Sequence, residues 1–223
     1  MKPDARYYQI EGMSLPSVTS ILGEFLPEGE SLQRWKSRTP NNRQVMERSA
    51  AIGTLVHYRI ASYFAEKYHT EPVLLDLKGA VMTEEMVETA NLLMSYFEDL
   101  LREHQIVPDK TEFTLWHRRA LYAGTADGRG TYDRLYTLLD WKTSNGIFPR
   151  HRAQLWAYKR ALQSDPKWGR KIDQLAIVDM SAKYGLKVEI VNEDKAEATW
   201  WEAFDNFQMA ERPQPKWLTR EMI

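Results

Sequence analysis

Cysteine is absent from this 223-residue sequence, which excludes disulfides, thiolate zinc sites and cysteine-ligated iron–sulfur clusters. The sequence also lacks an internal repeat, a low-complexity run and any apolar stretch as long as a membrane span. The first ten residues are polar and contain no apolar segment of the kind found in secretion signals. The formal net charge is only -1, so a globally basic nucleic-acid binder is not indicated. These absences predict a globular protein of a reducing compartment that has no membrane partner.

The composition is that of an ordinary folded domain, with 43% hydrophobic and 27% charged residues. The length is sufficient for one sizeable domain with its own core. We expect a single domain over residues 1–223, with a mainly helical part at 1–105, an α/β core at 106–210 and an irregular tail at 211–223.

Hydrophobic periodicity and capping residues predict the order of elements. Expected helices cover residues 17–26, 44–68 (with a kink near Gly53), 83–104, 149–162 and 194–209, and a basic amphipathic turn covers 32–38. Expected strands cover residues 7–10, 110–116, 120–132, 135–142, 173–180 and 186–191. Helix, three strands, helix, two strands and helix in this order indicate an α/β fold with a mixed central sheet flanked by helices.

Two acids and a lysine lie at the predicted strand ends of one hairpin. Asp127 is embedded in Gly124-Thr125-Ala126-Asp127-Gly128, and Asp140-Trp141-Lys142 closes an apolar run thirteen positions later. Carboxylate oxygens suit Mg²⁺ or Mn²⁺, and side chains two positions apart on a strand point to the same face. Lys142 would therefore lie beside the second acid, where an ammonium offsets charge on a phosphate under attack. The pattern predicts a metal-dependent site for phosphodiester cleavage.

Basic residues are concentrated around these acids. Residues 116–171 contain 12 Lys or Arg against 4 Asp, as a polyanionic substrate requires. The candidate phosphate contacts are Arg118, Arg119, Arg150 and Arg152.

Several other residues permit two interpretations. Trp35, next to Lys36, either stacks on an unpaired base or anchors a short helix. Thr143 and Ser144 either donate hydrogen bonds to phosphate or form the turn into the next helix. Glu112 is either an outer metal ligand or a surface acid.

His57, Gln154 and Tyr158 also remain open from spacing alone. His57 shares a helix face with three apolar residues, so it is either a core histidine or a ligand. Gln154 and Tyr158 lie one helical turn apart, which suits a polar surface stripe equally well.

Four motifs in order resemble those of the PD-(D/E)XK nuclease superfamily and its RecB-like exonuclease branch. These are Gly53-Thr54-Leu55-Val56-His57, the acid Asp127, Asp140-Trp141-Lys142, and Gln154-Leu155-Trp156-Ala157-Tyr158, which is similar to the Q-x-x-x-Y motif. Leu15-Pro16-Ser17-Val18-Thr19 and Arg34-Trp35-Lys36 are also similar to the mitochondrial genome-maintenance exonuclease group and its phage and bacterial relatives. The resemblance covers roughly residues 15 to 160.

The resemblance implies a restriction-endonuclease-like core and a divalent-metal-dependent deoxyribonuclease acting on single-stranded DNA ends. It implies that His57, Asp127, Asp140 and the backbone carbonyl of Trp141 bind Mg²⁺ or Mn²⁺, with manganese favoured by the imidazole. It further implies that Gln154 and Tyr158 line the substrate channel beside Lys142.

Two alternatives remain from the sequence: a structure-specific endonuclease of the same superfamily, and a non-catalytic nuclease-like DNA-binding subunit. The sequence has no helicase elements, so we expect a helicase, polymerase or recombination protein as a partner. The expected location is the cytoplasm of a bacterial or phage-infected cell. The mitochondrial matrix is less favoured because we find no transit peptide.

Overall fold

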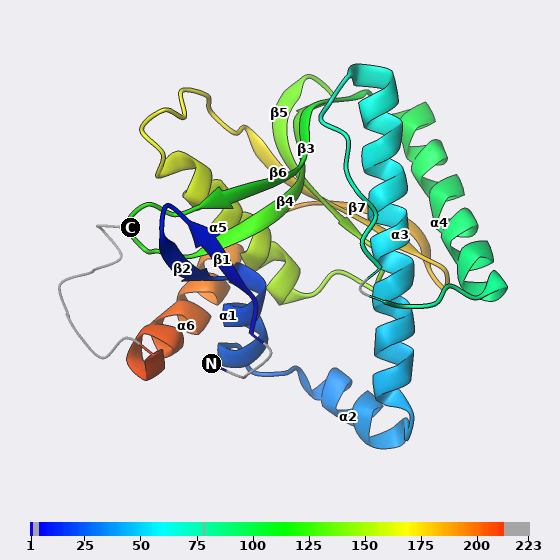
Figure 1. Cartoon of the computed structure of the whole chain (residues 1–223), viewed down its shortest axis with the longest axis horizontal. Coiled ribbons are helices and arrows are strands. Elements are labelled where there is room, and N and C mark those ends of the chain that lie inside the picture. The colour runs from blue at the N-terminus through cyan, green and yellow to red at the C-terminus, as the bar shows by residue number, and fades with distance from the viewer. Residues whose placement is uncertain (2–4, 78, 212–223) are drawn as a thin grey trace.

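A five-stranded mixed sheet forms the centre of the molecule (Figure 1). The computed structural model describes residues 1, 5–77 and 79–211. The strands lie in the order β3 (Ile106–Trp116), β4 (Ala123–Tyr132), β5 (Leu135–Lys142), β6 (Gln174–Ser181) and β7 (Gly185–Ile190). Neighbouring strands are antiparallel except β5 and β6, which are parallel and joined through helix α5 (Pro149–Gln163).

Helices cover both faces of this sheet. On one face α5 packs with α1 (Val18–Phe25) and α6 (Glu193–Glu211), and on the other lie α3 (Asn42–Tyr68) and α4 (Glu84–Glu103). Leu138 belongs to the first core cluster and Leu139 to the second, as expected when successive side chains of a strand point to opposite faces. This confirms the predicted α/β class with a mixed sheet flanked by helices.

Local sequence signals account for most of the boundaries. The side chain of Ser17 accepts a hydrogen bond from the Ser20 backbone N–H and caps α1, and that of Thr83 accepts from Met86 and caps α4. Pro149 is the first residue of α5, where its missing N–H costs nothing.

A short hairpin and a short helix depart from the predicted elements. Strands β1 (Tyr7–Ile10) and β2 (Met13–Pro16) pair as a separate hairpin, although only the first was predicted. The predicted amphipathic turn at 32–38 is the helix α2 (Glu30–Arg38), and α3 continues past Gly53 as one helix.

Strands β3 and β4 also differ in extent from the prediction. Strand β3 begins four residues earlier than predicted and contains Pro108, which is tolerated because β3 is an edge strand with a bulge between Pro108 and Lys110. Strand β4 begins at Ala123 rather than at Ala120. Because β4 runs from Ala123 to Tyr132, Asp127 lies in the middle of the strand and not at a strand end, which corrects the predicted placement.

The helical N-terminal part shares its core with the sheet, because buried residues of α1, α3 and α4 pack against strand residues. Glu211 ends α6, and the rest of the predicted tail, residues 212–223, lies outside the described residues. Within the described ranges, no helix combines the length and the apolar character needed to cross a membrane.

Candidate metal centre

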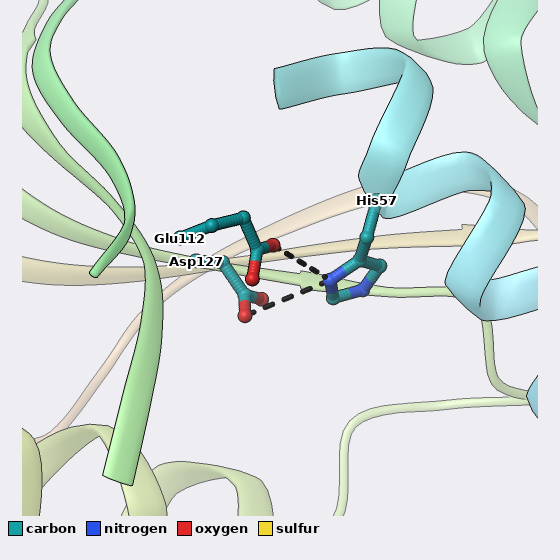
Figure 2. Close-up of side chains that lie close together, drawn as sticks. All are labelled: His57, Glu112 and Asp127. Atoms are coloured by element: carbon teal, nitrogen blue, oxygen red, sulfur yellow. Dashed lines mark ion pairs between the residues drawn. The ribbon is translucent and has the colours of Figure 1, made fainter. Parts of the chain in front are cut away.

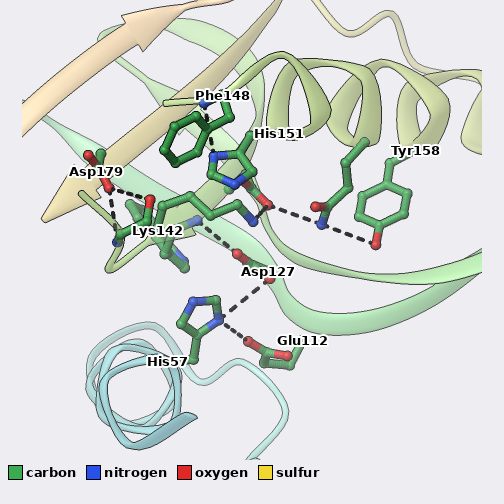
Figure 3. Close-up of polar contacts among 12 residues, drawn as sticks. His57, Glu112, Asp127, Lys142, Phe148, His151, Tyr158 and Asp179 are labelled. Carbon is green, nitrogen blue, oxygen red and sulfur yellow. Dashed lines mark hydrogen bonds and ion pairs between the residues drawn. The ribbon is translucent and has the colours of Figure 1, made fainter. Parts of the chain in front are cut away.

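Asp127, Asp140 and Lys142 meet where β4 and β5 separate (Figure 3). The Lys142 ammonium donates a hydrogen bond to Asp140 Oδ1 at 2.7 Å, so the lysine and the second acid share a face as predicted. The backbone N–H of Trp141 donates to Asp127 Oδ2 at 2.8 Å. This bond ties the first acid to the strand that carries the other two groups.

The regular alternation of side chains between the two faces of the sheet is interrupted in β4 near Asp127. A Cβ placed on Gly124 would meet the Tyr158 ring of α5, whereas one placed on Gly128 would face Leu139 and the indole of Trp141 on the opposite side of the sheet. Two positions four apart on a regular strand would share one face.

Strand β3, which pairs with β4, has an irregular backbone at the residue opposite Asp127. Thr111 pairs with Gly128 and Phe113 with Ala126, so Glu112 stands opposite Asp127. Glu112 has a φ of 45°, a conformation that costs a non-glycine residue about 1 kcal/mol or more. The Glu112 carboxylate lies beside Asp127 and His57, which agrees with the interpretation of Glu112 as a ligand rather than as a surface acid.

His57 completes the cluster from helix α3 (Figure 2). Its Nδ1 lies 3.5 Å from Glu112 Oε1 and 3.6 Å from Asp127 Oδ1. One ligand atom from each of these three residues lies within 4.8 Å of the other two. The His57 side chain is 26% exposed, so it stands at the edge of the core and faces the acids.

Helix α5 supports the cluster from the other face of the sheet. The Gln154 amide donates to Asp140 Oδ1 at 3.4 Å and to the Tyr158 hydroxyl at 3.3 Å. Tyr158 is buried, so this face of α5 is not a solvated polar stripe. Asp140 Oδ1 thus accepts from both Lys142 and Gln154.

Burial and the neighbouring charges together set the pKa of each of these groups. Burial raises the pKa of Asp140 to about 6 and raises that of Asp127, against the opposing charges of Lys142 and His57. Burial lowers the pKa of Lys142, but the carboxylates of Asp140 and Asp127 raise it more. Burial also lowers the pKa of His57, while Asp127 and the hydrogen bond with Glu112 raise it to about 9.

The donor set fits a divalent cation. Glu112, Asp127 and Asp140 contribute three negative charges and Lys142 one positive charge, which leaves two uncompensated charges when His57 is neutral. Asp140 Oδ2 is buried and has no hydrogen-bond partner among the described residues, as expected for an atom that awaits a ligand. Carboxylate oxygens with one imidazole suit Mg²⁺ or Mn²⁺, and the imidazole favours Mn²⁺.

Two further residues beside the lysine were not singled out from the sequence. Asp179 pairs in register with Lys142 on β6 and accepts hydrogen bonds from the Ser144 N–H and hydroxyl, both at 3.2 Å. Its signal was an isolated acid within the apolar run of residues 175–180. His151 Nδ1 accepts the Phe148 N–H at 3.3 Å, and burial together with Lys142 lowers the pKa of His151 to about 3.

The predicted nucleic-acid contacts Trp35 and Lys36 lie on α2, beyond one end of α3 (Figure 1). Trp35 is 36% exposed, whereas an aromatic side chain that anchors a helix is expected to be buried. Lys36 forms an ion pair with Glu28. Their role in DNA binding remains a prediction.

Arg118 and Arg119 follow the end of β3. The Arg118 guanidinium binds Asp165 at 3.0 Å, just past the end of α5, and that helix end lies roughly 14 Å along the axis from Gln154. Arg118 therefore has a structural partner at that helix end, and its contact with phosphate remains a prediction. Arg119 donates its backbone N–H to His117 Nδ1 at 3.3 Å, and its contact with phosphate remains a prediction.

The four predicted phosphate contacts near α5 differ in whether they already have a partner in the protein. Arg152 forms a two-pronged ion pair with Glu189, and Ser144 is bonded to Asp179, so both have structural partners. Arg150 is half-buried on the first turn of α5, and Thr143 lines a cleft beside the cluster. Phosphate contacts by all four residues remain predictions.

The cleft beside the cluster has a volume of about 520 Å³. Its walls include His57 and Gly53 of α3, Glu112 of β3, the segment of residues 73–76, and Arg6. Arg6 was not predicted, because a single arginine before a short strand carries no pattern.

No protein-family model matches this chain, and no curated protein matches it. One solved structure, described as "Crystal structure of SSO0001", aligns with a TM-score of 0.35 at 13% identity, over 74% of this chain and 76% of that chain. A likeness at this level supports no argument about function.

Proposed function

We propose that this protein is a divalent-metal-dependent DNA exonuclease of the PD-(D/E)XK superfamily, RecB-like branch, that prefers single-stranded ends. One observation carries the proposal: a buried carboxylate, Asp140, is bonded to Lys142 and stands beside the cluster of His57, Glu112 and Asp127. The composition of this group and the order of its motifs are those the superfamily resemblance implies.

The residues that would hold Mg²⁺ or Mn²⁺ are His57, Glu112, Asp127 and Asp140, with the backbone carbonyl of Trp141 as a further ligand. A divalent ion held there would lower the pKa of water and stabilise negative charge on a phosphate. The free Asp140 Oδ2 and the mutual approach of the other three ligands support this assignment.

Lys142 would act on the transition state rather than on the ground state. Its ammonium, held at 2.7 Å from Asp140, would offset the charge that develops on the phosphate oxygens. Gln154 keeps the Asp140 carboxylate oriented through a hydrogen bond, and Tyr158 in turn fixes Gln154. These two are positioning residues in the proposal.

The preference for single strands follows from the energetics of access. A flexible strand enters a narrow cleft directly, whereas a duplex end must first melt at about 1.4 kcal/mol per base-pair step. The sequence has no helicase elements to supply that energy, so a helicase, polymerase or recombination protein would act before it. We place this activity in the cytoplasm of a bacterial or phage-infected cell.

The test is digestion of DNA labelled at the 5′ or the 3′ end, as single strands, blunt duplexes and single-stranded circles, with Mg²⁺ or Mn²⁺. We expect rapid digestion of linear single strands, slow digestion of blunt duplexes, intact circles and no digestion by Lys142→Ala. Cleavage of circles would favour the endonuclease, and DNA binding without any cleavage would favour a binding subunit. Equal rates on blunt duplex and single strands would contradict the preference for unpaired ends.

A further inference from the structure

The cleft of about 520 Å³ has His57 and Arg6 among its walls. His57 belongs to the candidate metal centre, and its imidazole faces two acids. Arg6 comes from a different part of the chain, where it directly precedes strand β1, and it is exposed. An arginine on the wall of a cleft that ends at a metal-ligand cluster is placed for a phosphate group.

We propose that this cleft binds one nucleotide of a single strand, with Arg6 on its phosphate and Leu74 against its base. The proposal deepens the proposed function and rests on it, because it gives the strand a path to the cluster of His57, Glu112 and Asp127.

Arg6 is held in a fixed position relative to the cluster. Its guanidinium carbon lies 4.6 Å from the centre of the Tyr8 ring, a cation–π contact that orients the planar group. The Tyr8 hydroxyl is 3.0 Å from the Thr125 hydroxyl, and Thr125 stands two positions before Asp127 on β4. The chain of contacts therefore links Arg6 to the strand that carries the first acid.

The backbone of Arg6 is fixed as well. Its N–H donates to Ser20 Oγ at 2.8 Å, and its carbonyl accepts the Ser17 N–H at 2.9 Å. Both serines belong to the capped first turn of α1. Little conformational entropy remains to be lost when the guanidinium binds an anion, which favours affinity.

The segment of residues 73–76 provides the apolar part of the cleft. Leu74 is 93% exposed and Leu75 is 40% exposed, although both line a concave site where water could be displaced. An exposed apolar side chain at the mouth of a cleft fits the face of an unpaired base, and such contacts tolerate any base. The segment is tied to β3 by the ion pair of Glu71 with Lys110 at 3.6 Å.

Charge and size fix the orientation of the strand. The Arg6 guanidinium attracts a phosphate to its side of the cleft, and the apolar Leu74, which also lines the cleft, suits a base. The volume is within the range of about 300–1,000 Å³ typical of small-molecule sites, which is room for a nucleotide but not for a duplex.

The experiment measures binding of a fluorescent oligo(dT) by anisotropy in EDTA over a series of salt concentrations, so that it does not depend on cleavage. Arg6→Ala is expected to weaken binding roughly three- to tenfold and to lower the salt slope by about 0.7, the value for one single-strand phosphate contact. Arg6→Lys keeps the charge and should restore most of the slope. Leu74→Ser should weaken binding about threefold without changing the slope.

Matched controls separate the site from general effects. Arg102→Ala removes the same charge from the outer end of α4, and Val81→Ser removes an equally exposed apolar side chain (85%) that is not part of the cleft. Both should bind as wild type does. In the cleavage assay with Mn²⁺, Arg6→Ala should raise KM more than it lowers kcat.

The outcomes distinguish the two proposals. If wild-type protein digests single strands but Arg6→Ala, with an unchanged melting temperature, keeps the wild-type affinity and slope, the cleft proposal is overturned and the proposed function stands. If wild-type protein neither binds oligo(dT) nor digests DNA, the proposed function itself fails. A loss of affinity in Arg102→Ala equal to that in Arg6→Ala would also overturn the cleft proposal.

Discussion

Replacement of Gly124 by alanine tests how closely β4 must approach helix α5. A Cβ at this position would lie 2.8 Å from Cζ and 2.9 Å from the hydroxyl oxygen of Tyr158, and closer still to Cε1. Carbon atoms at rest stay about 3.5–4.0 Å apart, so either the ring or the strand must move by roughly 1 Å. The ring is only 3% exposed and has little room to yield.

The magnitude follows from the cost of overpacking, which is about 1–3 kcal/mol per added methyl in a dense core. For a chain of this length the melting temperature falls by roughly 2–4 °C per kcal/mol, so we expect a decrease of about 2 to 12 °C. Movement of Tyr158 also disturbs Gln154 and hence Asp140. A displacement near 1 Å costs up to about a hundredfold in rate, so kcat should fall more than stability suggests.

The assay compares melting temperature and kcat for Gly124→Ala, Tyr158→Ala and the double variant. Removal of the ring removes the clash, so the double variant should be less destabilised than the sum of the single ones by about 0.5–3 kcal/mol. Gly23→Ala is the control: among the described residues, no atom outside the adjacent positions and the backbone of α1 itself lies within 4 Å of the added methyl, so this variant should be neutral or stabilising. Wild-type stability and kcat in Gly124→Ala, or strict additivity, would refute the reasoning.

The remaining predictions concern the cluster itself. Lys142→Ala should abolish cleavage while Mn²⁺ and DNA binding, measured by calorimetry and anisotropy, stay nearly intact, whereas Asp140→Asn should weaken Mn²⁺ binding too; a wild-type rate in Lys142→Ala would disprove the mechanism. His57→Ala should raise the Mn²⁺ concentration needed for half-maximal activity. It should leave the melting temperature in EDTA nearly unchanged at about pH 9, where the wild-type imidazole is losing its proton. A lower melting temperature with an unchanged metal requirement would instead indicate a core histidine. The folded-state pKa of His57 is raised to about 9, so the protonated imidazole stabilises the metal-free protein fully below about pH 6.5, and this stabilisation is lost towards pH 9. The melting temperature of the wild-type protein in EDTA should therefore fall between these pH values, while its affinity for Mn²⁺ rises. Glu112→Gly should keep or raise the melting temperature, because φ is 45° there, and should weaken Mn²⁺ binding; the opposite pair of results would contradict its role as a ligand.

Local features were predictable because they depend on residues a few positions apart. Ser17 and Thr83 cap helices through hydrogen bonds to their own first turns. Lys142 lies beside Asp140 because strand side chains alternate, and Gln154 reaches Tyr158 because they are one helical turn apart. Each of these follows from the geometry of a single element.

Features that depend on two or more elements were less accessible. The two interpretations of Glu112, ligand or surface acid, could not be separated from sequence, because its orientation depends on the irregular pairing of β3 with β4. The sequence offered four arginines as candidate phosphate contacts, but it could not show that Arg118 and Arg152 pair with Asp165 and Glu189, residues from other parts of the chain. Charge counted along the sequence does not show which carboxylate is nearest in space.

The sequence by itself determined the order of the helices and of the strands of the central sheet, the caps of α1 and α4, and the shared face of Asp140 and Lys142. It also determined the donor types that suit a divalent ion. Only the tertiary structure decided that His57, seventy positions before Asp127, faces it across 3.6 Å, and that Arg6 lies on the wall of the same cleft. The physical reason is that periodicity and capping act within a few residues. By contrast, the packing of two apolar cores against one sheet brings together α3, β3, β4 and the first hairpin, which are far apart in the sequence.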